Sequence, residues 1–424
     1  MKTRLAALLP AGDRRLLLTY IGLCLYGLAM LWSVTESIRG PYESFDPGVP
    51  KSIFWRQLIW MGIAWFMLLA GARLPLRHLE ALSPLFYGAS IVMLIAVLAV
   101  APVVMGARRW FPLGPFSLQP AEFAKICVIL LLARVMTRHS SERRSPAMVA
   151  QTGALVGLPF LLVLKEPDLG TALVFLAVWL AMITWYGVSW VFLLAVGSPV
   201  LSAVISFYSE SVVHQAWPWG IYLLLLLGVL FLGRFRLGES AVLLVGNIVT
   251  GLGIPFIWGL LEPYQQNRVL TFFDPSRDTM GAGYQVFQSK VAIGAGGLFG
   301  THYLRGTQKG LAFLPERQTD FIFSVVGEEL GLLGAAVLLL LFLFLILRGL
   351  DVAAEARRPF ASFVAIGATA YFCFHVVVNV SITSGLMPVT GVPLPLLSYG
   401  GSNLLTSAFL IGLLLNVGAR DYDA

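Results

Sequence analysis

The sequence LPERQTD (residues 314–320) runs directly into the apolar stretch FIFSVVGEELGLLGAAVLLLLFLFLIL (residues 321–347). The second stretch is longer than the ~20 residues that a helix needs to cross ~30 Å of hydrocarbon. Asp320 closes a long polar loop at the point where this predicted span begins. A carboxylate in that position suggests chemistry at a boundary between lipid and water.

The whole chain has the composition of a polytopic membrane protein. Hydrophobic residues make up 58% of its 424 residues and charged residues 12%, and its mean hydropathy is +0.82. These values predict an all-α bundle of membrane-spanning helices that forms one integral membrane domain over residues 1–424. The twelve candidate spans are about 16–34, 53–72, 81–101, 121–137, 147–164, 169–187, 190–208, 218–233, 240–260, 321–347, 361–383 and 402–418.

Two local features support this interpretation. The first candidate span lacks a small-residue cleavage site, so we expect it to be retained as a membrane helix. Cys24, Cys127 and Cys373 all lie inside apolar segments and show neither disulfide nor metal-binding spacing, which predicts that they are packing residues.

The net charge of +7 is explained by membrane topology. With a cytoplasmic N-terminus, every cytoplasmic loop is basic except the very short one near residues 187–189, as the positive-inside rule requires. Both termini are therefore predicted to be cytoplasmic. Nucleic-acid binding is disfavoured, because the basic residues are scattered over short loops and form no single face. The residues placed inside are Lys2, Arg4, Arg14, Arg15, Arg73, Arg77, Arg134, Arg138, Arg143, Arg144, Arg234, Arg236, Arg348, Arg357, Arg358 and Arg420.

A long loop, about residues 261–320, then lies on the outer side. A connection of this length is usually functional or separately structured. Asp274-Pro275 predicts a turn, and residues 284–291 predict a short helix. The glycines that follow are expected to interrupt regular structure. They are Gly294, Gly296, Gly297 and Gly300.

Several charged residues cluster at the predicted outer ends of spans. Arg109 opposes the usual charge bias of an outer loop, so an anionic ligand is its natural partner. Glu122 and Lys125 are three residues apart and share one helix face about a turn into a span. Two interpretations stay open for them: an ion pair that fixes helix packing, or a pair that lines a polar substrate cleft. Asp168 has the position of a helix N-cap, a role compatible with a place in a site.

Other polar residues lie deeper or in irregular segments. At least one of Glu328 and Glu329 must find a buried partner or stay protonated, and a structural network is the favoured interpretation. His375 is expected to be a satisfied interior residue. The glycines and prolines of residues 385–395 predict non-helical backbone at membrane depth, which is tolerated when it is buried in protein or lines a cavity.

These motifs resemble the SEDS (shape, elongation, division, sporulation) family of bacterial peptidoglycan glycosyltransferases over most of the chain. The sequences GTQ (306–308), FLPER (313–317) and MPVTGVPLP (387–395) are more similar to its RodA elongation branch than to its FtsW division branch. The resemblance implies polymerisation of lipid II at the outer face of the cytoplasmic (inner) membrane, during cell elongation and cell-shape maintenance. It also implies a class B penicillin-binding protein as the transpeptidase partner within the elongation machinery.

Asp320 matches the catalytic aspartate of the family. The implied role is a general base that activates the acceptor hydroxyl for inverting transfer. A divalent cation, Mg²⁺ or Mn²⁺, is a candidate cofactor, although the sequence shows no cluster of metal ligands. Arg109, Glu122, Lys125 and Asp168 match polar positions of the family's central cavity, and Lys290 and Arg317 are further candidate substrate-binding residues.

The chain departs from the family pattern at two places. Gln318 stands where the family commonly has His, so the surroundings of the acid differ here. The family core has ten spans, which predicts an extra two-helix hairpin at about 218–260 that leaves the long loop outside. An alternative function is a flippase for the lipid-linked precursor, which needs polar residues from one face to the other. A third is an inactive scaffold, which leaves Asp320 and the outward arginines without a role.

Overall fold

The computed structural model describes residues 13–36, 49–103, 107–114, 116–139, 146–188, 190–233, 235–260, 266, 270, 281–310, 314 and 316–420. The chain divides into two compact units. One comprises Met1–Tyr186 and Tyr284–Ala424, and the other comprises Gly187–Gly283. The predicted turn at Asp274-Pro275 lies outside the described residues.

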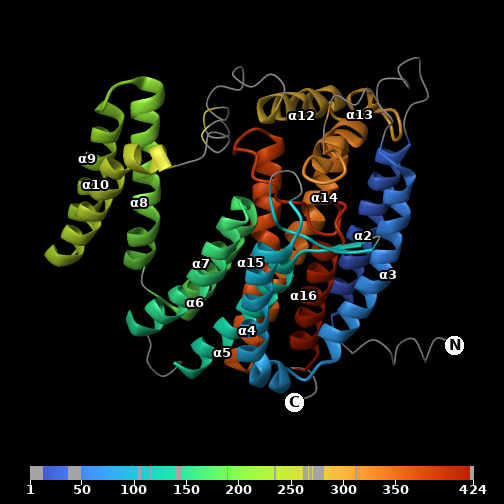
Figure 1. Cartoon of the computed structure of the whole chain (residues 1–424), viewed down its shortest axis with the longest axis horizontal. Coiled ribbons are helices and arrows are strands. Elements are labelled where there is room, and N and C mark those ends of the chain that lie inside the picture. The colour runs from blue at the N-terminus through green and yellow to red at the C-terminus, as the bar shows by residue number, and fades with distance from the viewer. Residues whose placement is uncertain are drawn as a thin grey trace. The chain divides into compact units, whose positions relative to one another are not determined.

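The first unit is a helical bundle with one short β-hairpin (Figure 1). The hairpin is antiparallel and pairs Phe111 with Leu118. The elements are α2 (Arg14–Thr35), α3 (Lys51–Arg73), α4 (Leu76–Val100), β1 (Phe111–Leu113), β2 (Phe116–Leu118), α5 (Pro120–Arg138), α6 (Pro146–Lys165), α7 (Leu169–Tyr186), α12 (Ala282–Gly296, from Tyr284 on), α13 (Thr307–Gly310), α14 (Ile322–Glu355), α15 (Pro359–Thr383) and α16 (Gly401–Arg420).

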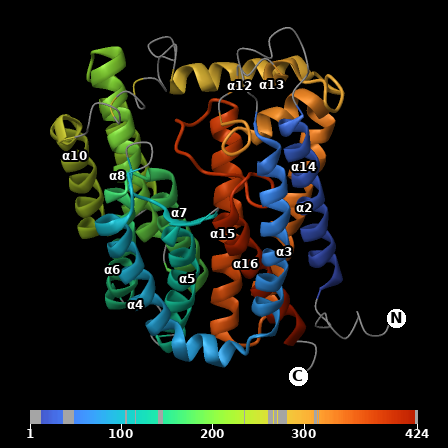
Figure 2. The same ribbon diagram turned by 45° about the vertical axis from the view of Figure 1, so that its right-hand side comes forward.

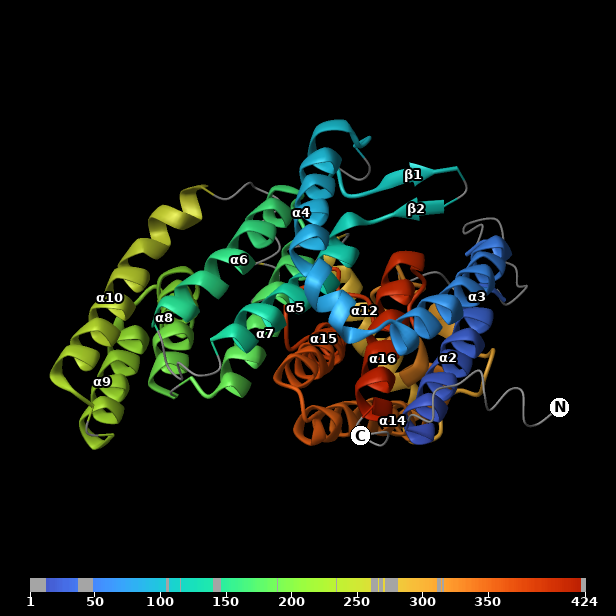
Figure 3. The ribbon, with the colours of Figure 1, turned by 90° about the horizontal axis from the view of Figure 1, so that it is seen from below.

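Helices α15 and α16 form the centre of this unit. The apolar windows of α16 and α15 are 89% and 72% buried, whereas those of α3 and α4 are 22% buried. Figure 3 shows α16 among α3, α14 and α15. A methyl group on Gly412 would collide with Leu68 O, so the backbones of α16 and α3 are in contact. Asn416 Nδ2 secures this contact by donating to Gly71 O and Leu74 O at 2.8 and 2.7 Å.

Helices occupy all twelve predicted apolar segments, which confirms the all-α polytopic prediction. Within the described residues, nine helices are long and apolar enough to cross a membrane. Helix α5 is not among the nine, because it carries Glu122, Lys125 and Arg134. Helix α9 (Trp217–Leu232) has only 16 residues, and the apolar part counted for α8 (Trp190–Tyr208) is limited to Gly197–Tyr208.

Helix α14 is broken at Gly331, where φ is 65° and ψ is −164°. The break frees main-chain groups that a continuous helix would pair. The glycine-rich segment after α12 inserts there: Leu332 N donates to Gly297 O at 2.9 Å, and Thr301 N donates to Glu328 O at 2.9 Å. The half-helix Ile322–Leu330, which follows Asp320, is thereby fixed to the end of α12.

The short helix predicted at residues 284–291 is confirmed as part of α12. Ser289 anchors this helix: its Oγ lies 2.6 Å from Ser324 Oγ and donates to Thr383 O at 2.6 Å. Figure 2 shows α12 crossing over the ends of α14 and α15. The helix therefore covers the end of the bundle at which α14 begins.

The second unit contains α8, the π-helix η1 (Ser209–Val213), α9 and α10 (Leu237–Leu260). Small polar side chains of α8 join it to α10: Ser202 Oγ donates to Asn247 O at 2.8 Å, and Ser206 Oγ donates to Gly251 O at 2.9 Å. Tyr222 on α9 donates to Asn247 Oδ1 at 2.7 Å. Hydrogen bonds between small residues are a usual means of packing helices in membranes.

Candidate active site

Asp320 lies in a turn that begins at Glu316 and leads into α14. Thr319 N and Phe321 N both donate to Glu316 O, at 3.1 and 3.2 Å. Thr319 Oγ1 and Gln318 Nε2 donate to Glu316 Oε2 at 2.9 and 3.3 Å. The Gln318 side chain therefore helps to hold the turn that carries Asp320.

Asn379 on α15 fixes this turn to the segment before α16. Its Nδ2 donates to Asp320 O and to Val392 O, each at 2.8 Å. A methyl group on Gly391, where φ is +74°, would lie 3.7 Å from Asp320 Oδ2. The carboxylate of Asp320 therefore lies beside the backbone of Gly391.

The non-helical backbone expected at residues 385–395 is confirmed. It continues to Tyr399, and its last residues bind the Asp320 turn. Ser398 Oγ donates to Thr319 O at 2.6 Å, and Tyr399 N donates to Gln318 O at 2.8 Å. Three independent side-chain and main-chain contacts thus fix the position of Asp320.

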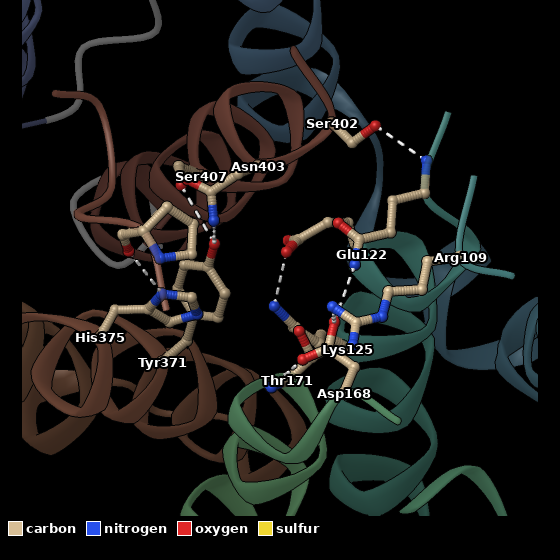
Figure 4. A network of polar contacts seen from close by, with 12 residues as sticks. Arg109, Glu122, Lys125, Asp168, Thr171, Tyr371, His375, Ser402, Asn403 and Ser407 are labelled. Carbon is tan, nitrogen blue, oxygen red and sulfur yellow. Dashed lines mark hydrogen bonds and ion pairs between the residues drawn. The ribbon is translucent and has the colours of Figure 1, made fainter. Parts of the chain in front are cut away.

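Arg109 binds the turn between α6 and α7. Its Nε donates to Glu166 O at 2.8 Å, its Nη2 donates to Pro167 O, and its Nη1 lies 3.9 Å from Asp168 Oδ2. Gln119 Nε2 also donates to Asp168 Oδ2, at 3.3 Å. The sequence-predicted residues Arg109 and Asp168 are therefore neighbours (Figure 4).

Asp168 is the predicted cap of α7, because its Oδ1 accepts from Thr171 N at 3.0 Å. The adjacent acid, Glu166, is fully buried. The pKa of the Glu166 carboxyl is raised to about 8, mainly by burial and also by the negative charge of Asp168, while the positive charge of Arg109 partly opposes the increase. Glu166 could not be singled out from the sequence, because Arg109, which contacts its turn, comes from a separate loop.

Glu122 and Lys125 form a buried ion pair, with Lys125 Nζ 2.7 Å from Glu122 Oε1. Their side chains are only 2% and 1% exposed. Lys125 Nζ also lies 5.4 Å from the centre of the Tyr371 ring on α15, within cation–π range (Figure 4). A substrate can therefore reach Lys125 only if neighbouring side chains move.

A polar stripe on α15 connects the Lys125 pair with the Asp320 turn. Tyr371, His375 and Asn379 are four residues apart and share one helix face. His375 Nδ1 lies 3.0 Å from Pro393 O, so this interior histidine binds the same segment that Asn379 holds. Polar residues at this spacing in an apolar helix are the sequence signal that would have identified Tyr371 and Asn379.

Arg109 and Asp168, together called the Arg109–Asp168 cluster, lie near the same segment, on the side of α7. A methyl group on Gly170, two residues after Asp168, would collide with Thr390 O. Residues 390–393 thus lie between the start of α7 and the start of α14. This segment brings the Arg109–Asp168 cluster and Asp320 to one end of the bundle.

The two remaining candidates lie around Asp320. Arg317 is buried within the Asp320 turn. Lys290 is exposed on α12, and a methyl group on Gly385 would collide with its side chain. Lys290 therefore crosses the end of α15 close to the segment that holds Asp320.

Glu328 and Glu329 have structural partners, as expected. Glu328 Oε1 accepts from Gln308 N at 2.7 Å, and Ser33 Oγ lies 2.7 and 2.6 Å from the two carboxylate oxygens of Glu329. Over the described part of the chain, no three His, Cys, Asp or Glu side chains gather into a metal-binding group.

The chain matches known proteins over almost its full length. A family of cell cycle proteins named for FtsW, RodA and SpoVE matches residues 14–217 and 219–422. Peptidoglycan glycosyltransferase MrdB of Escherichia coli K12 is 35% identical over 96% of this chain and 93% of its own. A probable peptidoglycan glycosyltransferase FtsW of Alkalilimnicola ehrlichii is 34% identical, over 97% and 90%.

A solved structure agrees with these relatives. A chain reported under "Structural coordination of polymerization and crosslinking by a peptidoglycan synthase complex" superposes with a TM-score of 0.66 at 30% identity. The match covers 98% of this chain and 99% of that one. This chain therefore belongs to the FtsW, RodA and SpoVE family, the SEDS peptidoglycan glycosyltransferases.

Proposed function

We propose that this protein polymerises lipid II into glycan strands at the outer face of the cytoplasmic membrane, during cell elongation and cell-shape maintenance. The observation that carries the proposal is the placement of Asp320, whose turn is fixed by Asn379, Ser398 and Tyr399. The Arg109–Asp168 cluster borders the same segment. A base and a cation at one end of the bundle suit transfer from a pyrophosphate-linked sugar.

In this proposal Asp320 is the general base. It takes the proton from the 4-hydroxyl of the acceptor GlcNAc while that oxygen attacks the anomeric carbon of the donor MurNAc. The bond from this carbon to the pyrophosphate oxygen breaks, and undecaprenyl pyrophosphate leaves with the electron pair. An α-linked donor gives a β-1,4 product in one inverting step, so a single base is sufficient and no sugar becomes attached to the enzyme.

The departing pyrophosphate needs cations. Arg109 is 29% exposed and is the first cation to be reached. The main-chain oxygens of Glu166 and Pro167 orient its guanidinium, and the Asp168 carboxylate lies beside it. Lys125 lies deeper behind its pair with Glu122 and completes the site only after local movement. Lys290 and Arg317 supply charge around Asp320.

We further propose a membrane topology and a place in the elongation branch of the family, both of which the sequence favours. Both termini are cytoplasmic, and the α12 end is extracytoplasmic. The integral membrane domain consists of a ten-span core and an added hairpin formed by α9 and α10. The motifs at residues 306–308, 313–317 and 387–395 support the elongation branch. The similarity to a chain from a peptidoglycan synthase complex supports a class B penicillin-binding protein as partner.

The test is glycan synthesis by the purified protein with its partner and fluorescent lipid II. Asp320→Asn keeps the size of the side chain but removes the base, so we expect polymerisation to fall by roughly 10²–10⁴-fold. Asp351→Asn is the matched control, because Asp351 is exposed near the opposite end of α14. Polymer formation by Asp320→Asn at the wild-type rate would overturn the role of Asp320.

A flippase is the competing function, and the deep acids argue against it. Glu328 and Glu329 are occupied by Gln308 and Ser33, so neither is available to a crossing head group in this structure. Transbilayer movement of lipid II, measured in the same liposomes, separates the two. Movement without polymer would favour the flippase.

A further inference from the structure

Glu166 is a buried acid that the reaction above does not use. It lies in the turn between α6 and α7 and is 0% exposed. Neither of its carboxylate oxygens has a hydrogen-bond partner among the described residues. Unpaired buried carboxylates are costly, and a buried polar group without a partner calls for an explanation.

The contacts of the neighbouring groups show what surrounds Glu166. Arg109 holds the turn through the main-chain oxygens of Glu166 and Pro167. The Asp168 carboxylate accepts hydrogen bonds from Thr171 N and Gln119 Nε2, and its Oδ2 also lies 3.9 Å from Nη1 of Arg109. Glu166 is left without any of these donors.

Two carboxyl groups in one desolvated turn cannot both ionise without repulsion. Asp168 carries the negative charge, because its partners compensate for it. The other charged groups near this turn do not change that balance. Glu122 and Lys125 on α5 neutralise each other, and Lys165 on the preceding turn is exposed.

We propose that Glu166 acts as a neutral carboxylic acid that admits an anionic pyrophosphate to the Arg109 side of the site. In its neutral form Glu166 adds no charge beside Arg109 and Asp168, so the Arg109 guanidinium can attract a phosphate group. In its ionised form it adds a second negative charge beside Asp168 and repels the phosphates. Glu166 is thus a specificity-determining residue for a pyrophosphate-bearing ligand, a role that rests on the proposed function.

The buried position is consistent with this role, because burial raises the pKa of Glu166 to about 8. The carboxyl is therefore protonated at neutral pH and ionises on the alkaline side. A bound dianion nearby favours the protonated form further. Binding of the pyrophosphate and protonation of Glu166 therefore favour each other.

The first experiment is a pH profile of KM and kcat for lipid II, with the full-length protein and its partner. For the wild type, KM is expected to rise by up to about tenfold for each pH unit above pH ~8, as for one ionising group. Glu166→Gln keeps the shape but cannot ionise, so its KM is expected to stay level to pH ~9. Glu355→Gln, at an exposed acid on α14, is the control and should follow the wild type.

The outcomes separate the two proposals. A KM that rises equally in the wild type and in Glu166→Gln overturns the role of Glu166 while leaving the polymerase intact. A wild-type preparation that makes no polymer with its partner overturns the proposed function itself. Should Glu166→Gln fail to fold, the inference is tested by binding of undecaprenyl pyrophosphate to the wild-type protein. We expect weaker binding at pH ~9 than at pH ~7. Equal binding at the two pH values would overturn the role of Glu166.

Discussion

Single side chains in this protein show how charge is kept inside a membrane bundle. Lys125 is nearly inaccessible, yet it has both an ionic partner in Glu122 and an aromatic one in Tyr371. Removing one member of such a pair leaves the other charge buried without a counter-charge, whereas replacing both with apolar residues leaves no buried charge. The pair is therefore expected to behave as a unit.

We expect Lys125→Met to destabilise the protein by roughly 3–5 kcal/mol, because it leaves Glu122 buried without a counter-charge. The double variant Glu122→Leu/Lys125→Met is expected to be less destabilised than Lys125→Met alone. Thermal unfolding in detergent measures both. Additive losses of stability would contradict a coupled pair.

Glu166 has a pH-dependent effect on stability whose sign follows from its pKa. The pKa is raised to about 8 in the folded protein, compared with ~4.3 for an exposed glutamate. Between these values the folded state binds more protons, so this contribution to stability is full below the lower pKa and is lost as pH rises to about 8. Glu166→Gln cannot ionise and avoids this loss.

The melting temperature of Glu166→Gln should therefore exceed that of the wild type by a few degrees at pH 8 and by little at pH 5. Differential scanning fluorimetry over this range measures the difference. The control Glu355→Gln should melt at the wild-type temperature throughout this range. A melting-temperature difference between Glu166→Gln and the wild type that shrinks toward pH 8 would contradict the prediction.

At the scale of single residues, only contacts between residues that are close in the sequence could be predicted. The Asp168 cap was predictable, because its partner Thr171 is three residues away. Asn379 and Asp320 are 59 residues apart in the chain, and Glu166 and Arg109 are 57 apart. Pairings at that separation are set by how helices pack, so motif reasoning does not reveal them.

Among the elements, α14 is the one that hydropathy describes incompletely. Residues 321–347 read as one uninterrupted span, and helix does begin at Ile322 as predicted. The break at Gly331 is invisible to hydropathy, because an apolar run is equally apolar whether straight or broken. The glycines after α12 were predicted to interrupt structure, but their insertion into α14 depends on contacts distant in sequence.

We expect Gly331→Ala to destabilise the protein by about 1–3 kcal/mol, because φ of +65° with ψ of −164° is accessible essentially only to glycine. The added methyl would also collide with Gly300 N. Gly294→Ala is the matched control, since it lies in α12 with open space around it and alanine favours helix. Equal melting temperatures for the two variants would contradict a required break.

For the whole molecule, the proposed topology is what turns these contacts into a function. Hydropathy predicted the helices well, because a bilayer leaves apolar helices few alternatives. The site could be predicted only through resemblance, because its parts come from α4–α5, α6–α7, α12, α14 and α15–α16, which meet only after folding. Asp320 can meet lipid II at the outer leaflet only if the α12 end of the bundle is extracytoplasmic.

Cysteine labelling in spheroplasts tests this orientation. Lys290→Cys places a thiol at an exposed position on α12, and Asp351→Cys places one at an exposed position near the other end of α14. A membrane-impermeant maleimide should label Lys290→Cys in intact spheroplasts and Asp351→Cys only after permeabilisation. The unsubstituted protein sets the background, because its three cysteines are buried or half-buried in helices. The reverse pattern would place Asp320 in the cytoplasm and exclude polymerisation at the outer face.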